Sequence, residues 1–249
     1  MLRSPLASVW TTVLGGVLSC LFVLFATPAM ADLITVPSDQ PTIQAAIDAA
    51  VDGDEVRVLP GNYRERLNLL GKKIRIYGSI PNPNLNFISQ PDGGSGRLVT
   101  CTSGEDENTI IENFTIRNGV SGGMVISNAS PVIRNCRFLE NTGVNRGGAV
   151  SVTGESSVRF ESVEFIDNNC SGGSGTGGGA IFLSGASCEV TLQSCRLESN
   201  SISGDRSLYG GAVYCTDAAS LSVDDCVFLA NQITGNTGGC GGYNCSVTV

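Results

Sequence analysis

Two segments, GGAIFLSGASCEVTLQSCRLESN at 178–200 and GGAVYCTDAASLSVDDCVFLAN at 210–231, repeat one pattern of glycine, apolar and asparagine positions. The offset between them is about 31 residues, and a fixed period in this range is typical of stacked repeats. Weaker copies follow Gly147-Gly148-Ala149 and Gly122-Gly123-Met124, and the faintest copy, at 109–116, lacks the glycines. The pattern therefore predicts a solenoid in which each repeat packs on the next.

The apolar positions of one repeat predict three short strands. In the last repeat, Leu221, Val223, Cys226 and Phe228 follow one another at steps of two, three and two. A step of two places side chains on one face of a strand, so the step of three indicates a bend between two inward-facing strands. A third strand follows each glycine pair. Three short strands per stacked repeat predict a parallel β-helix of about six or seven coils, whose neighbours share one core.

A small polar residue precedes the inward position after each bend. Asn and Asp tolerate a left-handed backbone, so we expect these residues to form the bends and to bond to each other between coils. They are Asn113, Asn135, Ser162, Ser194 and Asp225. The glycine pairs are expected to turn the chain sharply into the third strand. Before them come variable loops rich in Gly, Ser, Asn and Thr, where binding usually takes place.

Residues 1–31 have the pattern of a secretory signal peptide. Arg3 precedes an apolar stretch from about Val9 to Phe25, and Ala29-Met30-Ala31 provides an A-x-A cleavage site. An uncleaved membrane anchor is the alternative, because the apolar stretch is almost long enough to span a bilayer. We therefore expect a protein that is secreted, extracellular or on the cell surface, with no stable membrane insertion after cleavage.

Residues 32–249 are expected to form one domain. An N-terminal cap is predicted at 32–53, where Pro41-Thr42 opens an amphipathic helix and Gly53 ends it. Irregular first coils are predicted at 54–108 and regular repeats at 109–249. Because 241–249 begin a new coil and stop, we expect truncation or an uncapped edge, and with it end-to-end self-association.

The charge balance limits the class of partner. The chain has 15 Lys and Arg against 23 Asp and Glu, a net charge of −8, and no histidine. An acidic protein is a poor partner for nucleic acid or for an anionic membrane surface. Without histidine, Ser-His nucleophilic sites and histidine-metal sites are excluded.

Two resemblances support the β-helix. The segment Thr42-Ile43-Gln44-Ala45-Ala46-Ile47, followed by GDEV at 53–56 and LPGNYRE at 59–65, resembles the opening of pectin-lyase-like right-handed β-helix proteins. The Gly-Gly-Ala pieces with Phe-x-x-Asn, at 138–141, 165–168 and 228–231, are similar to the repeats of chlamydial polymorphic outer membrane proteins. Together they cover most of the mature chain and imply an all-β, right-handed parallel β-helix. This superfold hosts lyases, hydrolases and adhesins, so it does not decide function.

A resemblance to polysaccharide lyases implies a groove along one strand of each coil, with carboxylate-bound Ca²⁺ and a basic residue that takes a proton from the sugar. The repeat register predicts that Ser151, Phe182 and Tyr214 point outward on the strand after the glycine pair. None is a carboxylate or a base, and Ca²⁺ needs several oxygen ligands. We therefore assign no catalytic residue, no metal ligand and no cofactor; Ca²⁺ enters only under the lyase alternative.

The other acidic residues are interpreted as solvated outward positions. Asp167 and Glu198 are expected at aligned positions one coil apart, which makes them the nearest approach to a hydrolase pair.

Phe182 and Tyr214 are the predicted ligand-binding residues, together with Ser151. Exposed aromatic rings on a rigid strand can stack on sugar rings. In the alternative, a neighbouring loop covers them, or the two rings only stabilise each other as a pair.

Ten cysteines, one of them in the signal segment, leave nine in the mature chain. Cys136, Cys195 and Cys226 occupy the inward position after a bend and are expected as buried thiols. Cys170, Cys188, Cys240 and Cys245 are the predicted disulfide candidates, because an oxidising compartment permits such bonds.

The leading functional hypothesis is a non-catalytic, adhesin-like module that binds a polysaccharide or a cell-surface partner. The first alternative is a polysaccharide lyase or glycoside hydrolase, and the second is a passive structural component of the envelope.

Overall fold

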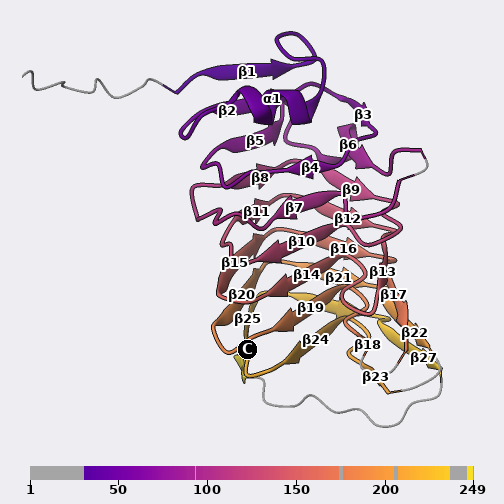
Figure 1. Cartoon of the computed structure of the whole chain (residues 1–249). Coiled ribbons are helices and arrows are strands. Elements are labelled where there is room, and N and C mark those ends of the chain that lie inside the picture. Colours follow the sequence, from indigo (N-terminus) through magenta and orange to yellow (C-terminus); the bar gives the residue numbers. More distant parts are fainter. Residues whose placement is uncertain (1–30, 93, 174–175, 205–206, 236–245, 249) are drawn as a thin grey trace, which may run out of the picture.

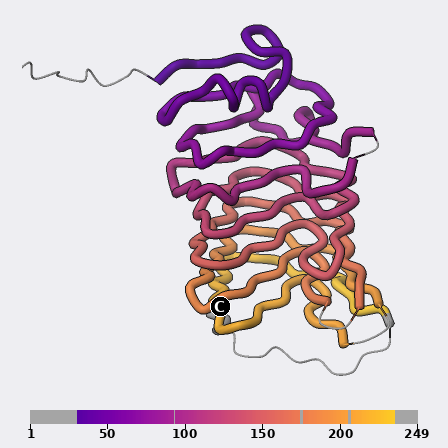
Figure 2. Tube along the Cα trace, in the orientation of Figure 1, coloured from indigo at the N-terminus to yellow at the C-terminus, as the bar shows by residue number. Residues whose placement is uncertain are grey.

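A computed structural model describes residues 31–92, 94–173, 176–204, 207–235 and 246–248 (Figure 1). The predicted signal peptide therefore lies almost wholly outside the described residues. Figure 2 shows the chain winding into stacked coils from the indigo N-terminal end to the yellow C-terminal end. Because every strand pairs in parallel with strands of the neighbouring coils, the molecule is a parallel β-helix, as the repeat spacing predicts.

Three long sheets form the walls. Sheet A contains β1 (Leu33–Val36), β2 (Glu55–Val58), β5 (Arg75–Gly78), β8 (Ile110–Glu112), β11 (Val132–Arg134), β15 (Ser156–Glu161), β20 (Cys188–Gln193), β25 (Ser220–Asp224) and β28 (Ser246–Thr248). Sheet B contains β3 (Gly61–Tyr63), β6 (Asn86–Ser89), β9 (Thr115–Arg117), β12 (Arg137–Leu139), β16 (Glu164–Ile166), β21 (Arg196–Glu198) and β26 (Val227–Leu229). Sheet C contains β4 (Leu67–Asn68), β7 (Val99–Cys101), β10 (Met124–Ser127), β14 (Val150–Thr153), β19 (Ile181–Ser184) and β24 (Val213–Thr216).

Each coil runs from sheet A through sheet B to sheet C. The coils that begin with β2, β5, β8, β11, β15 and β20 are complete, and β25 with β26 begins a seventh, which agrees with the predicted number. Residues 78–108, which lie within the predicted irregular first coils, are more regular than expected. They contribute the 3-10 helix η1 (Pro83–Leu85) and the strands β6 and β7, because alternate residues such as Ile88, Val99 and Cys101 are buried.

The bend between sheets A and B has the predicted left-handed backbone. The φ angles at the five bend residues are 66° at Asn113, 43° at Asn135, 54° at Ser162, 51° at Ser194 and 49° at Asp225. The expected bonds between coils form in part. The Nδ2 of Asn135 donates to the Oδ1 of Asn113 at 2.6 Å, and the Oγ of Ser194 lies 3.4 Å from the Oδ2 of Asp225.

A more regular ladder of hydrogen-bonded asparagine side chains lies at the next bend, after sheet B. It is formed by the last residue of each Phe-x-x-Asn or equivalent motif. Asn141, Asn168, Asn200 and Asn231 stack there, and the first three are fully buried. The Nδ2 of each donates to a carbonyl of the preceding coil at 2.9 Å, and the Nδ2 of the first three also donates to the Oδ1 of the next asparagine at 2.9–3.0 Å. The Oδ1 also accepts from a backbone N–H of the preceding coil. The ladder thus satisfies buried polar groups that would otherwise cost free energy.

The core between the walls is apolar and stacked. Phe138 and Phe165 lie parallel on adjacent coils, with ring centroids 5.2 Å apart, and Phe160 meets Phe165 edge-on at 5.4 Å. Cys136 and Cys195 are buried at the position after the bend, as predicted, whereas Cys226 in the last coil is only half-buried. Offset and edge-on arrangements are the favourable geometries for aromatic pairs, so the stack reinforces the coil register.

The glycine pairs act in two ways. The first glycine of the pair has a left-handed backbone, with φ of 60° at Gly147, 72° at Gly178 and 68° at Gly210, which confirms the predicted sharp turn. The second glycine has no room for a side chain. A Cβ on Gly179 would lie 2.0 Å from the carbonyl oxygen of Gly211, so adjacent coils touch backbone to backbone at this corner.

A fourth sheet replaces the predicted loops in the later coils. Sheet D contains β13 (Thr142–Val144), β17 (Asn169–Gly172), β22 (Ser201–Gly204) and β27 (Gln232–Gly235), and β18 (Thr176–Gly177) pairs with β23 (Leu208–Tyr209) beside it. Cys170, Ile202 and Leu208 form a second buried cluster, against which Ile233 packs. The expectation of free loops after each ladder asparagine is therefore wrong here: Cys170 and Ile202, two residues after Asn168 and Asn200, are buried, and Ile233 after Asn231 packs against them.

The helix α1 (Ile43–Ala49) covers the first coil. Thr42 is its N-cap, as predicted, but the helix ends at Ala49 rather than at Gly53. Two charged side chains from the first coil hold its ends. The carboxylate of Glu65 accepts from the N–H groups of Ile43 and Gln44 at 3.0 Å. The Nζ of Lys72 donates to three carbonyls at 2.7–2.8 Å near the C-terminal end. The negative charge of Glu65 at the N-terminal end and the positive charge of Lys72 at the C-terminal end both interact favourably with the helix dipole.

Replacing Lys72 by Met should loosen this cap alone. The variant leaves the carbonyls of Ile47, Asp48 and Ala50 without their charged donor, and coupling in a solenoid is mainly between neighbours. We expect amide hydrogen exchange in α1 to rise about tenfold, equivalent to about 1.4 kcal/mol, with no change in β14–β24. Lys73→Met, which removes one exposed ion pair to Asp106, is the matched control. A uniform rise along the chain would contradict this local role.

Candidate functional site

The predicted binding residues lie in register on sheet C but are covered. Ser151 pairs with Phe182, and Phe182 pairs with Tyr214, on three successive strands. Their exposed fractions are 5%, 3% and 9%, so the expectation of an exposed aromatic face is wrong. The two rings meet edge-on at 5.7 Å.

The cover comes from the segments between sheets D and C. The ring of Tyr209 stacks on that of Tyr214 at 4.9 Å, and the guanidinium of Arg146 lies 5.2 Å from the centroid of Phe182. Gly177 packs so closely against Tyr214 that a Cβ at this position would come within 1.8 Å of the ring. The variable segments fold back over sheet C, which is why the outward positions of β19 and β24 are not free to stack on a ligand.

The outer face of sheet A is open and carries stacked charges. Arg75 lies between two acids of neighbouring coils, 3.1 Å from Glu55 and 2.9 Å from Glu112. Two coils beyond Arg75, Arg134 on β11 lies 2.7 Å from Glu161 on β15. These pairs are partly exposed, so their electrostatic attraction contributes little to stability. They do give the face a regular polar surface on rigid strands.

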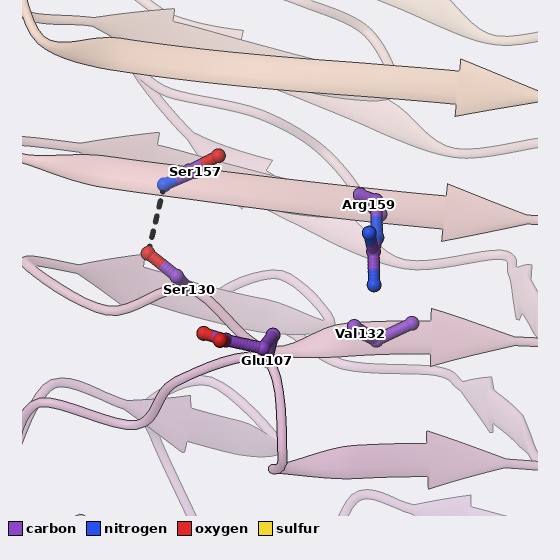
Figure 3. A pocket seen from close by; sticks show the side chains of 5 residues that line it. All are labelled: Glu107, Ser130, Val132, Ser157 and Arg159. Carbon is purple, nitrogen blue, oxygen red and sulfur yellow. Dashed lines mark hydrogen bonds between the residues drawn. The ribbon is translucent and has the colours of Figure 1, made fainter.

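A pocket of about 310 Å³ opens on this face beside β11 and β15 (Figure 3). Glu107, Ser130, Val132, Ser157 and Arg159 line it. Val132 and Arg159 are register partners on adjacent strands, and Ser130 and Ser157 precede them by two residues in their own coils. The N–H of Ser157 donates to the Oγ of Ser130 at 2.9 Å, which ties the two coils together at the pocket. Three of the five lining residues thus lie on the paired strands β11 and β15, while Ser130 and Glu107 lie in the segments that precede β11 and β8.

The two charged side chains of the pocket do not pair with each other. Figure 3 shows Glu107 at the left of the pocket and Arg159 at the right, where its side chain points toward Val132. Arg159 is half-exposed, and its only ion pair among the described residues is a long one of 3.7 Å to Glu161. Within the same described residues, the Glu107 side chain makes no hydrogen bond or ion pair. Both charges are thus available to a ligand.

The expected hydrolase pair is not aligned. Glu198 stands opposite Ile166, not Asp167, and its carboxylate lies 2.7 Å from Arg196. Asp167 occupies a left-handed bend with φ of 52°. Over the described ranges, no group of three or more Cys, Asp or Glu is placed to hold a metal ion.

The disulfide prediction is wrong for two of its four cysteines. Cys170 and Cys188 are fully buried free thiols, and burial raises the pKa of each to about 11. Cys240 and Cys245 lie outside the described residues. Cys136 and Cys195 are also free, and burial raises the pKa of both to about 12, so these thiols remain protonated at neutral pH.

The comparison with family models decides the family. Residues 84–247 match the model described as right handed beta helix region. The chain belongs to the right-handed β-helix family. The handedness implied by the resemblance at 42–65 and the parallel stacking of the coils agree with this assignment. Searching the curated proteins gave no significant match.

Among solved structures, two similar ones are pectin methylesterases. That of Aspergillus niger, in penultimately deglycosylated form, has 15% identity and a TM-score of 0.47, covering 89% of this chain and 87% of its own. That of carrot has 12% identity and a TM-score of 0.41, covering 90% of each chain. In the described part of the chain, no helix combines the length and apolar character needed to cross a bilayer.

Proposed function

We propose that this right-handed β-helix is a secreted or cell-surface protein that binds a glycan without turnover, through the pocket on the outer face of sheet A. The observation that carries the proposal is the polar pocket around Val132 and Arg159. A site with most of its lining residues on paired strands loses little conformational entropy when it binds a ligand. The pocket volume also falls within the range typical of small-ligand sites.

The residue types suit sugars. Ser157 is exposed, and in the described structure its Oγ makes no hydrogen bond, so it can donate to or accept from a sugar hydroxyl. The guanidinium of Arg159 offers several parallel donors, and the Glu107 carboxylate offers acceptors. The proposal moves the binding site from the predicted sheet C residues, which are covered, to sheet A.

Arg159→Gln should weaken glycan binding about tenfold or more, because a hydrogen bond to a charged group contributes about 1.5–3 kcal/mol. The measurement is retention of purified residues 32–249 on acidic and neutral polysaccharides, with and without Ca²⁺. Arg196→Gln is the control, since Arg196 lies on sheet B, away from the pocket, and pairs with Glu198. Equal retention of both variants would contradict the site.

The same samples test the enzymatic and structural alternatives. Release of unsaturated products or new reducing ends would replace the binding hypothesis with a lyase or a hydrolase. Sedimentation without ligand tests the end-to-end self-association expected from the sequence. The proposal predicts retention without product.

A further inference from the structure

We infer that the sheet A pocket is selective for a zwitterionic sugar unit, one that carries both an ammonium group and a carboxylate. This inference rests on the proposed glycan-binding function and names the ligand class of the same site. It starts from the separation of Glu107 and Arg159 across the pocket (Figure 3).

Two of the neighbouring charges have partners of their own, whereas Glu189, the register partner of Ser157 on β20, has no ion pair among the described residues. Asp106, next to Glu107 in the chain, forms an ion pair of 2.8 Å with Lys73. On the other side, the Glu161 carboxylate accepts from the Nε of Arg134 at 2.7 Å, in addition to its long contact with Arg159. Glu107 and Arg159 are therefore the charges that the pocket itself presents, one negative and one positive.

A ligand with a single charge would satisfy only one of them. A carboxylate can receive two parallel N–H donors from the guanidinium of Arg159. An ammonium group at the other end can donate to Glu107. Ser157, whose side chain is exposed, offers a hydroxyl to the ring substituents. Complementary charge at both ends also rejects ligands that bring like charges together.

The experiment uses four monosaccharide probes that carry different combinations of the two charged groups. Muramic acid carries an ammonium and a carboxylate, N-acetylmuramic acid only the carboxylate, glucosamine only the ammonium, and glucose neither. Affinities are measured by titration calorimetry or ligand-observed NMR with residues 32–249 at low salt, where screening is weak. We expect muramic acid to bind about tenfold or more tightly than any of the other three.

Two variants assign the preference to its residues. Glu107→Gln should abolish the advantage of muramic acid over N-acetylmuramic acid, and Arg159→Gln should abolish its advantage over glucosamine. Both side chains are exposed or half-exposed, so both variants should fold, which circular dichroism checks.

The outcomes separate this inference from the proposed function. Equal affinity for the four probes, no binding of muramic acid, or a preference that survives both substitutions would overturn the inference. If polysaccharides are still retained in an Arg159-dependent manner, the proposed function stands without it. If neither polysaccharides nor probes bind, both fail.

Discussion

Asn168→Leu should be among the most destabilising single substitutions in the chain. The Oδ1 of Asn168 accepts from the backbone N–H and from the Nδ2 of Asn141 at 3.1 and 3.0 Å, and all these atoms are buried. Leucine leaves both donors without an acceptor in a place that water does not reach. Each such group costs about 1–3 kcal/mol, so we expect a loss of about 2–6 kcal/mol in the free energy of unfolding.

Chemical denaturation monitored by circular dichroism measures this loss. Asn84→Leu is the control, because Asn84 is exposed and accepts one hydrogen bond from Arg137 at 3.2 Å; it should stay within about 0.5 kcal/mol of the wild type. Equal stability of the two variants would show that the ladder does not hold the coils together.

Gly179→Ala should be comparably severe, for a steric reason. The new Cβ would lie 2.0 Å from the carbonyl oxygen of Gly211 and 2.7 Å from that of Ser201. Both atoms belong to the backbone of the neighbouring coil and cannot rotate away. Overpacking against flexible side chains costs about 1–3 kcal/mol, so this substitution should reach the upper end of that range or exceed it.

Gly173→Ala provides the matched comparison. A Cβ at Gly173 meets nothing within 4 Å, and its backbone is not left-handed, so alanine should be neutral or slightly stabilising. Thermal unfolding of the two variants side by side gives the difference. A Gly179→Ala protein as stable as Gly173→Ala would mean that adjacent coils do not touch at this corner.

The sequence alone predicts the solenoid because the same pattern of glycine, apolar and asparagine positions recurs from coil to coil. Steps of two and three place Phe138 and Phe165 inward, and the polar residues before the inward positions, such as Asn113, adopt the left-handed bends that the pattern predicts. Handedness followed only from the family resemblance. The fourth sheet was missed, although Cys170 and Ile202 both stand two residues after a ladder asparagine and are buried.

The candidate site was predicted less well, for two physical reasons. The strand alternation predicts that outward positions are exposed, yet Phe182 is buried because a segment outside the repeat register folds over it. The sheet A pocket combines regular positions with an irregular one. The alignment of Val132 with Arg159 follows from the repeat. Glu107 lies in a segment that does not repeat, so the repeat period does not predict its position.

The most direct test of the central claim is to map where the bound glycan lies. Hydrogen–deuterium exchange of residues 32–249, with and without the best-retained polysaccharide, reports protection strand by strand. We predict protection at 130–132 and 157–159, lost in Arg159→Gln, with no change around Tyr209 and Tyr214. Protection confined to the sheet C side, or none at a saturating concentration, would contradict a binding site on sheet A.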